Sequence, residues 1–95
     1  ADDYPTVGVA VGIEVRDGRC TEARIALNAV GPTVIRAYSA EQALRGNELT
    51  EAVIKAAAAT VPALCDPVAD HRGSADYKKR MAEVFTRRAI QKAIA

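Results

Sequence analysis

The stretch DPVADHRGSADYKK, residues 66–79, separates two parts of the chain with different sequence patterns. Residues before it show strand-like alternation and then alanine-rich helical segments, and residues after it follow one long basic helical pattern. The stretch itself is polar and has neither period. Ser74 is a suitable N-cap, Gly73 permits a turn before it, and Asp76 places a negative charge in the first helical turn. The stretch therefore predicts a fixed start for the last helix.

That last helix is expected over residues 75–94. Apolar side chains fall near one of its faces, and charged side chains lie largely around the other. The expected apolar face is Tyr77, Met81, Val84, Phe85, Ala89 and Ile94, and the charged set is Lys79, Arg80, Glu83, Arg87 and Lys92.

Charge is distributed unevenly along the chain. From residue 72 onward seven Lys or Arg residues stand against two acidic residues, whereas residues 1–71 carry six basic and ten acidic residues. The net charge of +1 by itself indicates no class of partner. We interpret the basic helix as a solvated face or as a charged interface with another part of the same assembly. Nucleic-acid binding is the alternative, but neither base-stacking aromatics nor a groove-reading helix is visible, so we predict no nucleic-acid partner.

Strict alternation marks residues 7–15, VGVAVGIEV, as a strand. One face carries valine and isoleucine. The other face, called the small face, begins with three very small residues, Gly8, Ala10 and Gly12. A small face indicates the close approach of another backbone, a helix or a neighbouring domain.

A hairpin is expected to follow, because Asp17-Gly18 is a turn signal and a second alternating segment comes directly after it. The second strand is predicted over residues 20–29. Its apolar face is Ala23, Ile25 and Leu27, and its polar face includes Glu22, Arg24 and Asn28.

The register of this hairpin depends on the length of the loop. A two-residue turn would pair Ile13 with Glu22 and set an apolar face against charges. A three-residue loop that ends at Gly18 would pair Val11 with Ala23 and bring both apolar sets to one face. We therefore predict the three-residue loop, with Gly18 in a left-handed conformation as a bulge residue.

Turn and cap signals place the next elements. Gly31-Pro32 marks a turn, and residues 33–36 are short and β-branched, which indicates a third strand or an extended arm. Ser39 and Gln42 have the spacing of a capping box. This box predicts a short helix that ends at Gly46.

A second helix is expected over residues 51–60, with Thr50 as its cap and Pro62 after its end. Strands followed by helices indicate an α+β fold. We predict an antiparallel three- to four-stranded sheet with about three helices packed on one face. At 95 residues the chain is expected to form a single domain, residues 1–95.

Composition narrows the cellular setting. Cys20 and Cys65 have neither metal-ligand spacing nor a CxxC arrangement, so we interpret them as reduced, buried thiols of an intracellular, cytoplasmic protein, with a disulfide as the alternative. No apolar run approaches the length of a membrane span, and no signal peptide is visible. Because the chain begins with Ala-Asp-Asp and enters a strand at once, we expect it to be cut from a larger chain or to be a processed product.

The sequence offers few candidates for catalytic or metal-binding residues. His71 is the one histidine, and with Asp70 beside it a proton relay is conceivable, although a lone histidine in a polar loop is more often structural. Asp66 and Asp70 make a weak acid–base pair because Pro67 interrupts a helix between them. Phosphate-binding loops and zinc spacings are absent from the sequence. We therefore predict no catalytic and no metal-binding residues, and an interaction or cofactor-covering module.

Three blocks in order carry a family resemblance: DYP at residues 3–5 before the small-faced strand, RIALNAVGPTVIRAYSAEQALRG at 24–46, and DPVADHRGSADYKKRMAEVFTRRAI at 66–90. Together they resemble the C-terminal domain of the FAD-binding medium subunit of molybdenum hydroxylases, as in carbon monoxide dehydrogenase and xanthine dehydrogenase. The chain departs from the glycine-rich form of the turn at Asn28-Ala29, and Pro5 also differs. These departures affect which subfamily the chain is assigned to, and not the resemblance to the family.

The resemblance implies a fragment of an oxidoreductase, inert by itself. FAD would be bound mainly by N-terminal domains of the same subunit, which are outside this chain. A molybdenum cofactor and iron–sulfur clusters would lie in a large and a small partner subunit. Electrons would pass from the clusters to FAD and then to an external acceptor, while this domain covers the flavin and contacts the partner subunits.

The resemblance also suggests roles for individual residues. Tyr4 matches the aromatic position that shields the flavin ring in relatives, although packing at the strand start is the alternative. Asp70, Arg72 and Ser74 are expected to form a charge-assisted network that fixes the last helix to the sheet. The competing hypothesis is a free-standing, non-catalytic binding module that uses its basic C-terminal helix, which leaves the small-faced strand unexplained.

Overall fold

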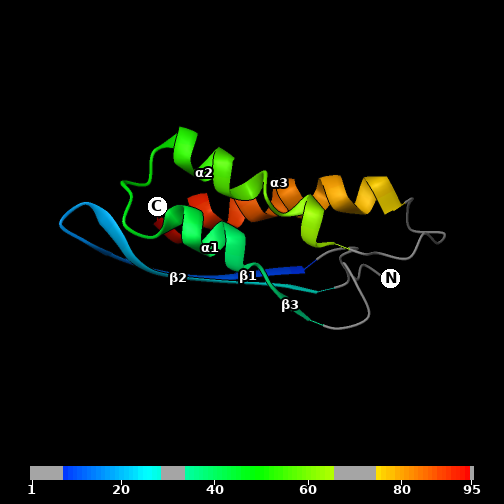
Figure 1. The fold of residues 1–95 in the computed structure, drawn as a ribbon, viewed down its shortest axis with the longest axis horizontal. Helices are drawn as coiled ribbons and strands as arrows, with labels where there is room; N and C mark the ends of the chain where they lie inside the picture. The colour runs from blue at the N-terminus through cyan, green and yellow to red at the C-terminus, as the bar shows by residue number, and fades with distance from the viewer. Residues whose placement is uncertain (1–7, 29–33, 66–74, 95) are drawn as a thin grey trace.

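A computed structural model describes residues 8–28, 34–65 and 75–94. It contains one antiparallel sheet in the order β1-β2-β3, with the helices gathered on one face of it (Figure 1). The elements are β1 (Gly8–Arg16), β2 (Arg19–Asn28), β3 (Ile35–Arg36), α1 (Tyr38–Leu44), α2 (Glu51–Ala58), the 3₁₀ turn η1 (Pro62–Leu64) and α3 (Ala75–Ile94). The predicted α+β fold is confirmed.

The loop of the hairpin has two residues, so the predicted three-residue loop is wrong. Asp17 and Gly18 both have positive φ angles, 53° and 78°, as in the primed turns that suit hairpins. Next to the turn Val15 pairs with Cys20, and a bulge then shifts the ladder. Thr21 is the extra residue of β2, because Glu14 pairs with Glu22.

The bulge brings the apolar side chains of β1 and β2 to one face, the result that was expected from a three-residue loop. Beyond it Val11 pairs with Ile25 rather than with Ala23, and Ile13 takes Ala23 as its partner. The apolar side chains of both strands therefore share the face under the helices, as predicted. Ala23, Ile25 and Leu27 are fully buried there.

The outer edge of β2 is paired well beyond the two residues of β3. The Ala37 amide donates to the Ile25 carbonyl at 2.9 Å. Near the hairpin, the Gly46 amide donates to the Cys20 carbonyl at 2.7 Å, and the Cys20 amide donates to the Asn47 carbonyl at 2.9 Å. The segments on either side of α1 therefore continue the sheet edge, which satisfies backbone groups that a short strand would leave without partners.

These contacts explain why the predicted capping box at Ser39 is wrong. The N-cap of α1 is Ala37, without a side-chain cap, and Ser39 lies inside the helix. Docking of the Ala37 amide on β2 sets the helix start. The predicted end is confirmed, since Gly46 follows the helix with a φ of 78°. In α2 the predicted cap is also confirmed, because the Thr50 hydroxyl accepts from the Val53 amide at 3.2 Å.

Helix α3 has the predicted bounds but buries a different face. Its buried residues are Lys78, Ala82, Thr86 and Ile90, whereas Tyr77 and Ile94 are exposed. Met81 and Phe85, from the predicted face, do pack against the core. Helix α3 packs on both β1 and α2, and the small side chains at 82 and 86 are fully buried there. The Thr86 hydroxyl is satisfied within the helix by donating to the Ala82 carbonyl at 2.6 Å.

Candidate functional site

Among the described residues, no helix covers the face of the sheet opposite α1, α2 and α3, which we call the open face (Figure 1). On β1 the small side of the strand lies on this face, and Ala10 and Gly12 are exposed. A Cβ atom at Gly12 would meet no atom within 4 Å, whereas one at Gly8 would clash with the side chain of Asn28. The small side of β1 therefore faces away from the described helices, and the predicted close approach of another element or domain to it stays a prediction.

A shallow hollow of about 380 Å³ lies on this open face. Its lining comes from all three strands: Ala10, Val11, Gly12, Arg24, Ile25, Ala26 and Arg36. Most of its exposed lining is apolar, and Arg24 and Arg36 supply guanidinium groups. Such a surface accepts a flat or apolar group closely, with guanidinium donors at the rim.

Arg36 is held in place by a fully buried carboxylate. Its Nε donates to Glu41 Oε2 at 2.8 Å, and its Nη2 donates to Oε1 at 2.8 Å. The guanidinium carbon also lies 4.8 Å from the centre of the Tyr38 ring, in cation–π contact. Bidentate pairing and stacking fix the guanidinium plane, so Arg36 reaches the hollow with little conformational freedom.

Glu41 also completes the sheet edge. The Ile25 amide donates to its Oε2 at 2.9 Å, in the place where β3 has already ended. Arg45 Nη2 lies 3.5 Å from Oε1. Hydrogen bonds from Arg36 hold the pKa of Glu41 below its ordinary value, although burial acts in the opposite direction. The same pairing raises the pKa of Arg36.

Sequence reasoning missed this pair because Ser39 and Gln42 were interpreted as a capping box, which gave Glu41 between them no role. One signal was available. Glu41 shares a helical stripe with Ala37, Ala40 and Leu44, all of which are buried, so an acidic side chain stands on the apolar face of α1. A charge in that position needs a cationic partner close by, and Arg36 is five residues away.

All of the site residues predicted from the sequence lie outside the described part of the chain. These are Tyr4, Asp70, Arg72 and Ser74; His71 and Asp66 are also outside it. The flavin-shielding role and the charge network therefore stay predictions.

The described residues offer surfaces for binding. Among them, no group of three or more His, Cys, Asp or Glu side chains could hold a metal ion. Cys20 and Cys65 are free and buried, as expected, and burial raises the pKa of both thiols. None of the helices in the described ranges has the length and apolar content that a membrane span requires.

Comparison with known proteins identifies this architecture. The family model described as the CO dehydrogenase flavoprotein C-terminal domain matches residues 1–93. The chain is 38% identical over 93 residues to the carbon monoxide dehydrogenase medium chain of Hydrogenophaga pseudoflava, and 37% identical over 93 residues to that of Afipia carboxidovorans. Each match covers 98% of this chain and 32% of the relative.

Solved structures agree with the sequence comparison. The carbon monoxide dehydrogenase of H. pseudoflava that lacks the Mo-pyranopterin moiety superposes with a TM-score of 0.92 at 43% identity. Quinoline 2-oxidoreductase from Pseudomonas putida 86 superposes with a TM-score of 0.91 at 36% identity. Both alignments cover 96% of this chain and 32% of the other, so the chain spans about a third of the length of its relatives. By sequence and by fold, the chain belongs to the CO dehydrogenase flavoprotein C-terminal domain family.

Proposed function

We propose that this chain is the flavin-covering C-terminal domain of a FAD-containing medium subunit in a molybdenum hydroxylase, an oxidoreductase of the carbon monoxide dehydrogenase type. The open, small-faced side of the sheet is the observation that carries the proposal. The domain is one folding unit over residues 1–95, and it is not catalytic by itself. Its partners are the N-terminal FAD-binding domains of the same subunit, an iron–sulfur small subunit and a molybdenum large subunit, all in the cytoplasm.

The open face suits contact with the rest of the subunit. Ala10 and Gly12 carry almost no side chain, so a neighbouring domain can approach the strand backbone closely. The side chain of Arg24 makes no hydrogen bond or ion pair with any described residue, so it can bind an acceptor on that neighbour. Since relatives are about three times as long as this chain, a large neighbouring part is expected.

The described residues would cover a dinucleotide but not enclose it. A pocket that encloses a ligand buries most of its surface, and a shallow hollow of about 380 Å³ is at the small end of such sites. FAD would therefore be held mainly by the N-terminal domains. When bound, the flavin would supply electron exchange between iron–sulfur clusters and an external acceptor.

The residues of this chain would exclude water from the flavin and hold the domain in position over it. Tyr4, at the start of the first strand, would lie against the flavin ring and keep water from it. Asp70, Arg72 and Ser74 would fix the start of α3, so that the domain keeps its shape when it closes over the ring. The alternative, a free-standing module that acts through its basic helix, gives the open face no role.

The first test is the identity of the parent protein. We would isolate it from source cells with an antibody to this domain and record its size, visible spectrum and metal content. A larger chain that carries flavin and co-purifies with iron and molybdenum is expected. A colourless chain of only 95 residues would refute the proposal and favour the free-standing module.

A second test addresses the open face. Gly12→Trp places a large ring where the isolated domain has space, so the melting temperature of the domain should change little. In the full-length subunit the ring should obstruct docking and raise the accessibility of the flavin to a fluorescence quencher. Arg16→Trp, on the exposed end of the hairpin, is the matched control and should leave the flavin protected. Equal quenching in both variants would contradict docking through this face.

A further inference from the structure

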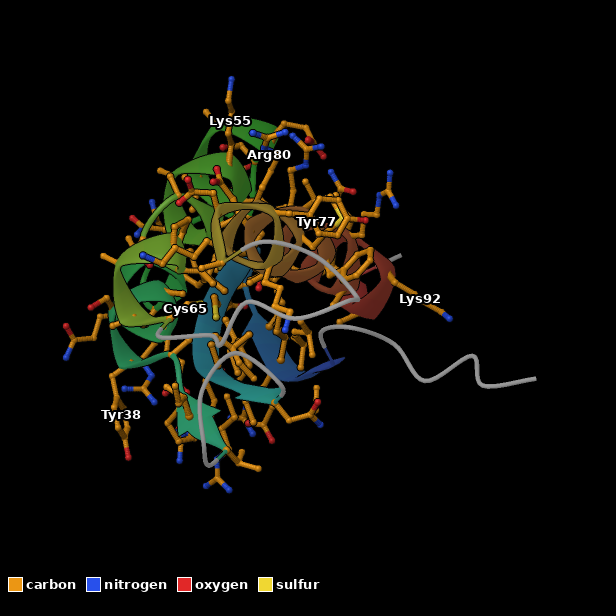
Figure 2. The ribbon with its side chains drawn as sticks, turned by 90° about the vertical axis from the view of Figure 1, so that its right-hand side faces the viewer. Tyr38, Lys55, Cys65, Tyr77, Arg80 and Lys92 are labelled. Atoms are coloured by element: carbon orange, nitrogen blue, oxygen red, sulfur yellow. The ribbon has the colours of Figure 1, made fainter. Side chains whose placement is uncertain are left out.

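A second hollow lies between α2 and α3, on the side of the helices remote from the sheet. Its volume is about 180 Å³. Figure 2 shows Lys55 of α2 and Arg80 of α3 together at the top of the view, above the helices, with the sheet below them. The lining is Lys55 and Ala58 from α2, and Arg80, Glu83, Val84 and Arg87 from α3. We call these six residues the basic groove.

The charges of the basic groove are not neutralised within the described part of the domain. Lys55, Arg80 and Arg87 make no ion pair with any described residue, and neither does Glu83. Three cations and one carboxylate therefore line one small hollow. Surface cations are usually dispersed among opposite charges. In the basic groove they converge on an unfilled space, which indicates a partner that brings negative charge.

The spacing of the cations restricts the shape of that partner. Arg80 and Arg87 are seven residues apart on one face of α3, which corresponds to about 10 Å along the helix axis. Lys55 lines the groove from α2, and Ala58 and Val84 supply the apolar part of its lining. A fitting segment carries carboxylates at both ends of a small apolar side chain. Each arginine can then pair with a carboxylate through two hydrogen bonds.

We propose that the basic groove docks an acidic protein segment of another subunit of the enzyme. The inference rests on the proposed function, since it assumes that the domain belongs to a multisubunit oxidoreductase. A protein segment is favoured over nucleic acid because the groove is short, no aromatic ring lines it, and Glu83 would face a continuous phosphate backbone. The docking surface lies on the side of the domain away from the open sheet face, so both contacts can form together.

The test uses the full-length medium subunit and the remaining subunits, purified separately and then mixed. The variant R80E/R87E should weaken assembly roughly tenfold or more, and the loss should shrink as salt is raised. The matched control is R88E/K92E, which reverses two exposed cations of the same helix outside the groove. Assembly of R80E/R87E with wild-type affinity would overturn the proposal.

A zero-length carbodiimide cross-link gives an independent readout, because it joins an amine only to a carboxylate in direct contact. Lys55 is the one lysine of the groove, and it should couple to an Asp or Glu of another subunit in the assembled enzyme. Lys55→Arg should abolish that cross-link while assembly is kept. Coupling at Lys92 without coupling at Lys55 would overturn the proposal.

Two further results separate the hypotheses. One result is that a labelled 20-mer of single-stranded DNA binds through Arg80 and Arg87 while R80E/R87E assembles normally with the other subunits. This result would refute the acidic segment as the partner and indicate nucleic acid instead. A medium subunit that carries no flavin and joins no iron- and molybdenum-containing subunits would refute the proposed function, and the groove proposal with it. A flavin-loaded subunit whose groove variants assemble normally would refute the groove alone.

Discussion

Substitution of Glu41 tests how the sheet edge and the first helix are held together. The carboxylate is fully buried and accepts from Arg36 twice and from the Ile25 amide once. Glu41→Ala leaves the Ile25 amide without an acceptor, at a cost of about 1–3 kcal/mol. Arg36 is less affected, because its side chain is 39% exposed and can bind water. Loss of a charged hydrogen-bonded pair and of side-chain packing raises the expected total to about 3–4 kcal/mol.

The free energy of unfolding of the isolated domain is the quantity to measure, by urea titration followed by circular dichroism. For a domain of this size, 3 kcal/mol corresponds to roughly 12–24 °C in melting temperature. Glu41→Gln should cost less, about 1–3 kcal/mol, because the amide oxygen can still accept from Ile25. A double-mutant cycle with Arg36→Gln isolates the pair energy. A loss below about 0.5 kcal/mol for Glu41→Ala would refute the reasoning, since surface substitutions have effects of that size.

Three further predictions concern titration, backbone and thiols. Folding lowers the pKa of Glu41, so the stabilisation by its carboxylate is present above the ordinary carboxyl pKa and is lost as pH falls through the lowered pKa. The difference in free energy of unfolding between wild type and Glu41→Gln should therefore shrink when urea titrations are made at acid pH. Gly18→Val should cost about 1–2 kcal/mol because φ is 78° there, whereas Gly12→Val should be near neutral in the same assay; equal effects would contradict the left-handed turn. Cys20 and Cys65 should react with iodoacetamide at least about 100-fold more slowly in the folded domain than in urea, and fast labelling without denaturant would contradict their burial.

Much of the fold is predictable from the sequence because its local signals and its tertiary contacts agree. The bounds of α3 and the Thr50 cap of α2 follow from local chemistry, and the structure has both. The buried face of β2 follows from period-two alternation. The family could also be recognised, because three blocks in a fixed order span nearly the whole chain.

The errors arise where a distant contact decides between local alternatives. Asp17-Gly18 was a correct signal for a two-residue turn, but the bulge at Thr21 that restores the register has no local signature. The start of α1 is set by the Ile25 carbonyl, twelve residues away in sequence from Ala37. The buried face of α3 depends on packing against two elements at once, which a helical projection does not include.

The two proposed contact surfaces impose different demands on the domain, and the structure explains how one small fold could meet both. The open sheet face needs small side chains on β1, and these weaken a strand unless its other side is well packed. The apolar side chains of β1 pack against the core beneath α3, which compensates for that weakness. The basic groove uses the outward side of the same helix, so α3 stabilises one surface and contributes side chains to the other. A variant that disturbs the packing of α3, such as Ala82→Leu, should therefore impair flavin protection and subunit assembly together, whereas Gly12→Trp and R80E/R87E should each impair one of them.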